Sequence, residues 1–395
     1  MKAKKRMLLS GNHAAAYGAK LSQVEVIPIY PITPQTTIVE KLTEFVERGD
    51  LIAKLVHVES EHSAMAAAIA AEAMGARTFT ATSSQGICYM HENLFSASGL
   101  RMPIVMAVVN RAIAMPICIN PDHIDSLAQR DTSWLQFYVE NAQEVLDTII
   151  QAYKVAEDPR VLLPVAVCFD GLVISHFYEP VQLPKAEKVV RFLGNYHPQH
   201  VVLHPDRPMS IGIFANELYL TEYKYQQQEA MENAKKVIKE VDQKYERKFG
   251  RGYGGSVQGY LIEDAKIGIL AMGSFNSLVR NVVKRLRGKG VKAGAIKLRV
   301  FRPFPMEELQ DMGGHLELLC VLDRDVSLGS GGIVHSEVAA AIHPLRNGPR
   351  LINFVLGLGG REVKEEELSA LVQGAWEGKK RGFERNPVKW VGVRG

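Results

Sequence analysis

Short runs of apolar residues without in/out alternation recur through the first half of this 395-residue chain. Strands covered on both faces have this composition, because neither face meets water. Helical patterns separate the runs, and such alternation is typical of a parallel sheet with helices on both sides. The predicted strands are residues 55–58, 78–82, 104–109 and 162–167.

The segments that follow these strands carry helix signals. Thr37 and Glu40 have the spacing of a capping box, after which apolar residues recur at helical intervals until Gly49. Residues 64–74 are almost all alanine or methionine, which suits a helix packed closely on most sides. Prolines interrupt residues 177–208, which we therefore expect to form an extended surface segment.

A second α/β rhythm follows a long charged helix that ends at Gly250 and a glycine-rich hinge. Its predicted strands are residues 267–272, 293–298, 318–322 and 351–356. We therefore expect an α/β protein with two domains, residues 1–250 and 258–378, and a basic tail at residues 379–395.

Charge and cysteine content exclude several classes of protein. The 47 Lys and Arg residues nearly balance the 43 Asp and Glu residues, for a net charge of +4. This balance excludes a polyanion-binding tail protein and an acidic disordered chain. No stretch approaches the ~20 unbroken apolar residues of a membrane span. The four cysteines form no C-x-x-C pair, which excludes a disulfide scaffold, a zinc ribbon and a ferredoxin-type cluster motif. We expect a cytoplasmic protein that binds neither nucleic acid nor membranes and has no metal site.

Four polar segments lie where α/β proteins hold ligands. Two prolines fix residues 30–34 just before a helix. Glu61 begins the alanine-rich helix, whose apolar composition predicts a buried carboxylate that shares a proton with a ligand nitrogen. Residues 82–86 directly follow a strand, and Arg111 ends another without an acidic neighbour, well shaped to grip a carboxylate. A rigid loop, a carboxylate that complements the helix dipole and a salt-bridged arginine remain the alternatives.

These segments resemble the α subunit of 2-oxoacid:ferredoxin oxidoreductases of the pyruvate synthase type. The likeness begins with Y-P-I-T-P at 30–34, V-E-S-E-H-S-A at 58–64 and F-T-A-T-S-S-Q-G at 79–86. It continues with N-R-A at 110–112, D-H-x-D at 122–125, Q-R-D-T-x-W at 129–134, N-A-Q-E at 141–144, R-P-F-P at 302–305 and G-L-G-G-R at 357–361. The resemblance covers nearly the whole chain except the tail.

The resemblance implies thiamine diphosphate (TPP) chemistry that is divided between chains. It implies a pyrimidine-binding TPP domain followed by a smaller domain like the C-terminal domain of transketolases. A β subunit would hold the Mg²⁺–diphosphate site and an iron–sulfur cluster, and γ/δ-type subunits would carry further clusters. This sequence lacks a G-D-G motif with a downstream asparagine pair, which agrees with that division.

The family pattern also implies roles for particular residues. Glu61 matches a helix-starting glutamate that hydrogen-bonds the pyrimidine ring nitrogen. Glu59 is the competing assignment, and only one of the two can face the coenzyme. Arg111 and Thr33 would bind the 2-oxoacid, and together with Glu61 they are the expected catalytic residues. The other expected coenzyme contacts are Tyr30, Pro31, Ile32, Thr33, Ser84, Gln85 and Gly86.

The implied reaction is the CoA-dependent oxidative decarboxylation of a 2-oxoacid with transfer of electrons to ferredoxin, or its reverse. A single cation, Arg111, beside the neutral Thr33 suits the monoanion pyruvate, which would yield acetyl-CoA and CO₂. Met115, Cys118 and Asn120 depart from the commonest pyruvate-type loop, so a branched-chain acid such as 2-oxoisovalerate is the main alternative. Oxalate and 2-oxoglutarate rank below it. A non-catalytic scaffold subunit that binds a nucleotide or CoA is the alternative from another class.

Overall fold

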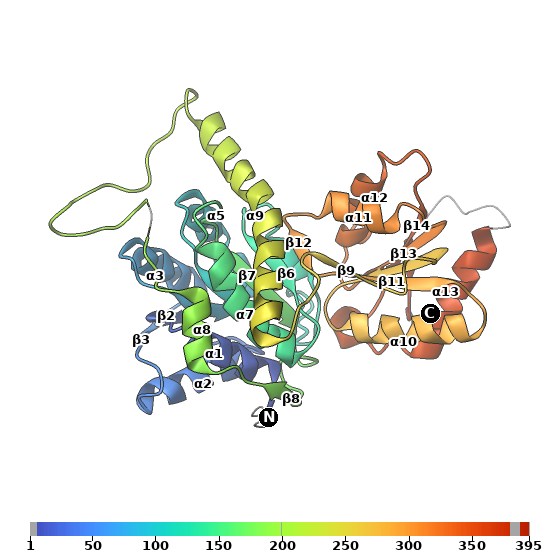
Figure 1. The fold of residues 1–395 in the computed structure, drawn as a ribbon, viewed down its shortest axis with the longest axis horizontal. Helices are drawn as coiled ribbons and strands as arrows, with labels where there is room; N and C mark the ends of the chain where they lie inside the picture. Colours follow the sequence, from blue (N-terminus) through green and yellow to red (C-terminus); the bar gives the residue numbers. More distant parts are fainter. Residues whose placement is uncertain (1–5, 199, 380–387, 395) are drawn as a thin grey trace.

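Two largely parallel β-sheets organise this computed structural model (Figure 1). The structure describes residues 6–198, 200–379 and 388–394. The first sheet has the strand order β12-β6-β7-β5-β4, in which β12 runs antiparallel to β6. The second has the order β15-β14-β13-β10-β11-β9, in which β9 runs antiparallel to β11. The predicted α/β class is therefore confirmed.

The strands of the first sheet are β4 (Phe79–Thr82), β5 (Val105–Asn110), β6 (Leu135–Tyr138), β7 (Val165–Asp170) and β12 (Val300–Arg302). Two small sheets, β1-β8 and β2-β3, flank it. Their strands are β1 (Arg6–Leu9), β8 (Glu179–Gln182), β2 (Val26–Ile29) and β3 (Lys54–His57). The helices of this half are α1 (Gly11–Leu21), α2 (Thr36–Glu47), α3 (Glu61–Ala73), α4 (Gln85–Tyr89), α5 (His91–Gly99), α6 (Ile124–Leu127), α7 (Ala142–Ala156), α8 (Ala186–Leu193) and α9 (Leu220–Phe249).

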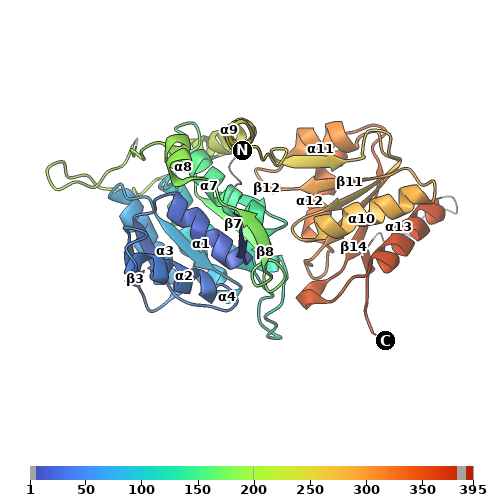
Figure 2. The same cartoon turned by 60° about the horizontal axis from the view of Figure 1, so that its bottom comes forward.

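The second sheet contains β9 (Val257–Tyr260), β10 (Ile267–Ala271), β11 (Ala293–Leu298), β13 (Leu318–Asp323), β14 (Arg350–Val355) and β15 (Val388–Trp390). Its helices are α10 (Phe275–Gly288), α11 (Met306–Gly313), α12 (Ile333–Ile342) and α13 (Glu365–Lys379), with a short 3₁₀ turn, η1, at Leu358–Gly360. Helices α10 and α13 lie side by side on this sheet (Figure 2).

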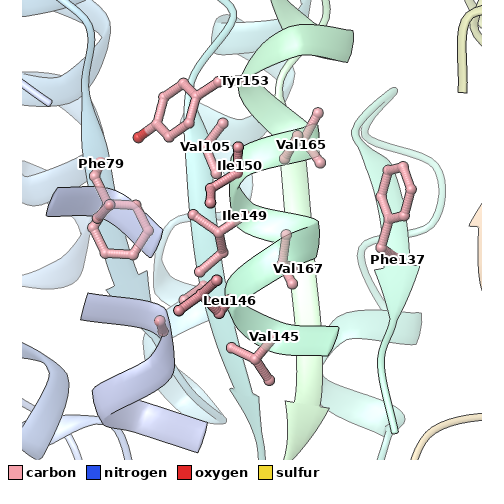
Figure 3. Close-up of a cluster of buried hydrophobic side chains, with 14 of the residues drawn as sticks. Phe79, Val105, Phe137, Val145, Leu146, Ile149, Ile150, Tyr153, Val165 and Val167 are labelled. Carbon is pink, nitrogen blue, oxygen red and sulfur yellow. The ribbon is translucent and has the colours of Figure 1, made fainter. Parts of the chain in front are cut away.

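Helix α7 covers one face of the first sheet. Its apolar side chains, Ile149 and Ile150 among them, point at the buried strands β5 and β7 (Figure 3). Every residue of these two strands is buried, as their unbroken apolar sequences predict. Alternate residues of β5, such as Met106 and Val108, face the other way into a second core. That second core also contains Ile296 and Val321 of the second sheet, so the two halves share apolar packing.

Some local predictions were wrong. Strand β3 lies at a sheet edge and is half-exposed rather than buried on both faces. Thr37 does not cap α2, because its hydroxyl accepts a hydrogen bond from Asn12 Nδ2 instead. The proline-rich stretch 177–208 is not extended throughout, because residues 186–193 form helix α8, which packs on the first core. Within its extended part, β8 pairs with β1. Helix α9 does end at the predicted Gly250, which adopts the left-handed conformation with φ +75°.

The predicted tail at residues 379–395 also differs from expectation. Within it, Val388–Trp390 forms β15, which pairs in parallel with β14 and extends the second sheet. Residues 380–387 and 395 lie outside the described part of the chain. Strand β15 is thus held by backbone hydrogen bonds that its basic composition could not reveal.

A buried carboxylate joins the two halves. Asp170, at the end of β7, contacts His123 Nε2 at 2.7 Å and Arg324 Nη1 at 2.8 Å. Its second oxygen accepts a hydrogen bond from the backbone N–H of Ser274 at 2.7 Å. Burial alone would raise the pKa of Asp170, but the charge of Arg324, followed by that of His123, lowers it well below its ordinary value.

We expect Asp170→Asn to lower the free energy of unfolding at pH 7 by ~3 kcal/mol, because it leaves the buried Arg324 without its partner charge. The folded-state pKa of Asp170 lies below its unfolded value, so this stabilisation is complete above the unfolded pKa of about 4 and is lost as the pH falls. Denaturant titrations of wild type and variant should therefore converge as the solution is acidified.

Asp50→Asn is the matched control, because Asp50 pairs with Lys20 at 3.1 Å on the exposed surface. Such a pair contributes less than about 1 kcal/mol. Equal stabilities of wild type and Asp170→Asn at pH 7 would contradict the role of Asp170.

Candidate active site

Two of the four predicted polar segments follow β4 and β5, which run in parallel with Thr82 opposite Val108. Residues 83–86 follow β4, and Arg111 follows β5. Ligands in α/β proteins bind at this edge of the sheet. The local topology therefore brings two of the four polar segments together.

Asp125 ties the ends of these two strands to each other. Its Oδ2 accepts hydrogen bonds from the backbone N–H groups of Ser84 at 2.9 Å and Arg111 at 3.0 Å. Its Oδ1 accepts from Asn110 Nδ2 and from the backbone N–H of Ser126, both at 2.8 Å. The carboxyl group is fully buried, and burial raises its pKa to about 6. Asp125 belongs to the D-H-x-D motif, but its role was not predicted. The sequence feature that could have indicated it is the pair of polar strand ends, whose backbone N–H groups need a buried acceptor.

Ser84 has a backbone conformation that few residues other than glycine adopt, with φ +50° and ψ −123°. The bond from its N–H to Asp125 holds it there, and its hydroxyl donates to the backbone oxygen of Ala112 at 2.6 Å. Ser84 also contacts the side chain of Gln85, which is half-buried. The loop after β4 is therefore fastened to the loop that begins at Arg111.

The Arg111 guanidinium is buried and is held by neutral groups. Nη1 donates to the backbone oxygen of Thr33 at 2.8 Å, and Nε donates to that of Cys118 at 3.4 Å. No described carboxylate forms a salt bridge with Arg111, and Nη2 hydrogen-bonds to no described residue. The alternative of an internal ion pair is thus absent from the described chain, and the charge of Arg111 is available to an external anion.

Residues 30–33 form the neighbouring surface turn. Gln35 closes this turn, because its side chain donates to the backbone oxygen of Tyr30 at 2.9 Å and its N–H donates to that of Ile32 at 2.8 Å. Pro31 and Thr33 are exposed, whereas Tyr30 and Ile32 are half-buried. Through its backbone oxygen, Thr33 is the member of this turn that contacts Arg111.

Glu61 is the first residue of α3, where Ser60 caps the helix by accepting a hydrogen bond from the N–H of Ser63. The Glu61 side chain is buried, at 7% exposed, yet no described residue hydrogen-bonds or ion-pairs with its carboxylate. Glu59 is exposed, and its carboxylate accepts a hydrogen bond from the Ser63 hydroxyl, which lowers the pKa of Glu59. The two glutamates therefore occupy different environments.

Gly86 is the immediate neighbour of the Glu61 carboxylate. A Cβ atom at residue 86 would lie 2.7 Å from Glu61 Oε1 and 2.4 Å from Thr82 Oγ1. Only glycine leaves this space open. Glu61 thus lies beside Gly86, two residues after Ser84. Ser84 and Arg111 in turn both donate a backbone hydrogen bond to Asp125.

A glycine-rich loop of the second half touches the loop that follows Arg111. A Cβ at Gly360 would lie 2.9 Å from Asn120 Cβ, and a Cβ at Gly359 would lie 3.1 Å from Cys118 Sγ. Both glycines have positive φ, which favours glycine at these positions. The second half therefore contributes to the surroundings of Arg111. This brings the N-R-A and G-L-G-G-R motifs close together, which their spacing in the sequence could not reveal.

Within residues 6–198, 200–379 and 388–394, no group of three or more His, Cys, Asp or Glu side chains is placed to hold a metal ion. In the same part of the chain, no helix is long and apolar enough to cross a membrane. The four cysteines are free thiols.

Two family models match most of the chain. Residues 17–243 match the thiamine diphosphate-binding domain of pyruvate flavodoxin/ferredoxin oxidoreductases. Residues 265–368 match core domain II of pyruvate:ferredoxin oxidoreductase.

Relatives and solved structures agree with these matches. Pyruvate synthase subunit PorA of Pyrococcus abyssi is 45% identical over 98% of both chains. Ketoisovalerate oxidoreductase subunit VorA of Pyrococcus horikoshii is 43% identical over 93% of both chains.

The 2-oxoglutarate:ferredoxin oxidoreductase of Magnetococcus marinus has a TM-score of 0.71 at 18% identity and covers 95% of this chain and 66% of its own. A split-gene transketolase has a TM-score of 0.53 at 14% identity, over 92% of this chain and 98% of its own. These two structures share the fold with this chain. By its family-model matches and its identity to PorA, the chain belongs to the pyruvate:ferredoxin oxidoreductase family, whose members are thiamine diphosphate-binding oxidoreductases.

Proposed function

We propose that this chain is the subunit of a 2-oxoacid:ferredoxin oxidoreductase that binds the aminopyrimidine of thiamine diphosphate and the carboxylate of the 2-oxoacid. The observation that carries the proposal is a pair of buried, oppositely charged side chains without charged partners among the described residues. Glu61 and Arg111 are each about 7% exposed, and both adjoin residues fastened to Asp125. Buried ionisable groups without partners are typical of functional sites.

The surroundings of Glu61 fit the pyrimidine ring of the coenzyme. A ring nitrogen that shares a proton with the carboxylate would give Glu61 the hydrogen bond that it lacks in this chain. Gly86 adds no side chain beside the carboxylate and leaves a small space there, which the Thr82 hydroxyl also borders. When bound, thiamine diphosphate supplies the nucleophilic carbon and the electron sink for decarboxylation of a 2-oxoacid. Glu61 would hold a proton at the ring nitrogen, and Arg111 would orient the acid.

The diphosphate and its Mg²⁺ would be bound by a partner subunit. Exposed apolar side chains on α3 and the two helices after β4 support this division: Ala66 and Ala70 of α3, Met74 directly after it, Tyr89 of α4 and Phe95 of α5. Apolar surface of this kind marks protein interfaces. A β subunit on this surface would enclose the coenzyme between the two chains. Iron–sulfur clusters of that and further γ/δ-type subunits would pass electrons to ferredoxin.

Pyruvate is the proposed 2-oxoacid, with CoA as the acyl acceptor. Arg111 offers a single cation to the carboxylate, and Thr33 beside it is neutral, which suits a monoanion. PorA of P. abyssi, named for pyruvate, and VorA of P. horikoshii, named for ketoisovalerate, have similar identities to this chain. A branched-chain acid is therefore the second candidate, and 2-oxoglutarate, a dianion, ranks below both.

In the assembled complex, Glu61→Gln should slow exchange of the C2 proton of bound thiamine diphosphate at least ~100-fold, because the ring nitrogen loses its ionisable partner. NMR of coenzyme quenched after transfer into deuterated buffer measures this rate. Glu59→Gln is the matched control and should exchange at the wild-type rate. Normal exchange in Glu61→Gln, or slow exchange in the control, would refute the assignment.

Replacing Arg111 with methionine should raise KM for pyruvate ~30-fold, because a charge-assisted hydrogen bond of about 2 kcal/mol is lost. Arg48→Met, at an arginine that pairs with Glu44 on the surface, is the control and should leave KM unchanged. CO₂ release with pyruvate, 2-oxoisovalerate and 2-oxoglutarate, in the presence of CoA and ferredoxin, gives kcat/KM for each acid. A wild-type complex that prefers 2-oxoisovalerate would favour the branched-chain alternative, and one that consumes no acid would favour a scaffold subunit.

Gly360→Ala should raise KM for the 2-oxoacid several-fold, since its Cβ would press on Asn120 and displace the loop that follows Arg111. Gly212→Ala is the matched control: Gly212 has φ +76°, close to the +74° of Gly360, but nothing lies within 4 Å of its added Cβ. Both variants carry similar backbone strain, of ~1–2 kcal/mol. A KM increase of equal size in both would show that strain alone is responsible.

A further inference from the structure

The hydroxyl of Thr82, the last residue of β4, is fully buried and hydrogen-bonds to no described residue. The other two threonines near this strand are satisfied: Thr78 donates to Glu72 at 2.7 Å and Thr80 donates to the backbone oxygen of Pro28 at 2.9 Å. A buried hydroxyl without a hydrogen-bond partner destabilises a fold. Thr82 therefore points to a partner that its own strand does not supply.

The Thr82 hydroxyl and the Glu61 carboxylate face one small space. Oγ1 of Thr82 and Oε1 of Glu61 lie 2.4 Å and 2.7 Å from the point that a Cβ of residue 86 would occupy. Gly86 leaves that point empty, and its N–H is fixed by a 2.9 Å hydrogen bond to the backbone oxygen of Ser83. The two oxygens are not hydrogen-bonded to each other in this structure, but both border the space that Gly86 leaves open and therefore lie close together.

We propose that Thr82 is a positioning residue that acts through Glu61. Its hydroxyl donates a hydrogen bond to Oε1 of Glu61, which leaves Oε2 directed at the ring nitrogen of the coenzyme. The glutamate side chain has three rotatable bonds, and one donor fixed on a buried strand removes most of that freedom when a ligand binds. This inference rests on the proposed function and adds a residue to which no role has been assigned.

The test compares two ligands on the complex assembled with its partner subunits. Dissociation constants are measured by calorimetry for thiamine diphosphate and for an analogue in which C–H replaces the ring nitrogen that faces Glu61. Thr82→Val removes the hydroxyl at nearly constant volume. It should raise the dissociation constant of thiamine diphosphate ~10-fold. The same variant should raise the dissociation constant of the analogue less than twofold, because the analogue has no ring nitrogen to hydrogen-bond with the Glu61 carboxylate. Thr82→Ser keeps the donor and should bind both ligands as wild type does.

Thr80→Val is the matched control, because Thr80 lies two residues earlier on the same face of β4 and its hydroxyl is already bonded to Pro28. It should shift the two dissociation constants equally or not at all. If Thr82→Val fails to assemble, Thr82→Ala replaces it and is compared with Thr82→Ser. Equal weakening of both ligands by the Thr82 variants, or none, would overturn the inference while the proposed function stands. A wild-type complex that does not bind thiamine diphosphate would overturn the proposed function itself.

Discussion

The candidate site depends on one buried carboxylate. Asp125 accepts four hydrogen bonds from donors at the ends of β4 and β5 and in α6. A fully buried carboxylate is costly unless its lone pairs are satisfied, so this arrangement fixes the two strand ends together. It holds Ser84 in a backbone conformation that an unconstrained serine rarely adopts and fixes the start of the Arg111 loop. The bond from the Ser84 hydroxyl to the backbone oxygen of Ala112 adds a second link between the two loops.

The other buried acidic side chains of the described chain form an ion pair or accept a hydrogen bond, which makes Glu61 stand out. Glu144 accepts from Lys297 at 2.7 Å and from Arg299 at 3.0 Å, and Asp170 pairs with Arg324 at 2.8 Å. These pairs join the two halves, and their charges neutralise each other. Glu61 and Arg111 are comparably buried but have no ionic partner among the described residues. Glu61 accepts no hydrogen bond from a described residue, and among those residues the Arg111 guanidinium contacts only neutral groups. Two such groups near one sheet edge are typical of a site for a ligand from outside the chain.

Much of this could be predicted because its physical cause is local. Continuous apolar runs predicted β5 and β7, and Gly250 predicted the end of α9, since each depends on neighbouring residues alone. Long-range partners decided the rest. Thr37 bonds to Asn12 rather than capping its helix, and Val388–Trp390 becomes a strand only because β14 offers an unpaired edge. Asp125 could be quoted as part of a motif, but its function as an acceptor depends on strands that are adjacent in space.

The second half of the chain supports the site as well as the fold. Asp170 fixes Ser274 and Arg324 against the end of β7. Strand β7 pairs with β5, the strand that Arg111 follows. The same half sends the Gly357–Gly360 loop onto Cys118 and Asn120. Because Cys118 in turn accepts a hydrogen bond from the Arg111 guanidinium, a shift of the second sheet would move a group that holds this cation. The position of the Arg111 guanidinium is therefore coupled to the packing of the two halves, although Arg111 itself belongs to the first.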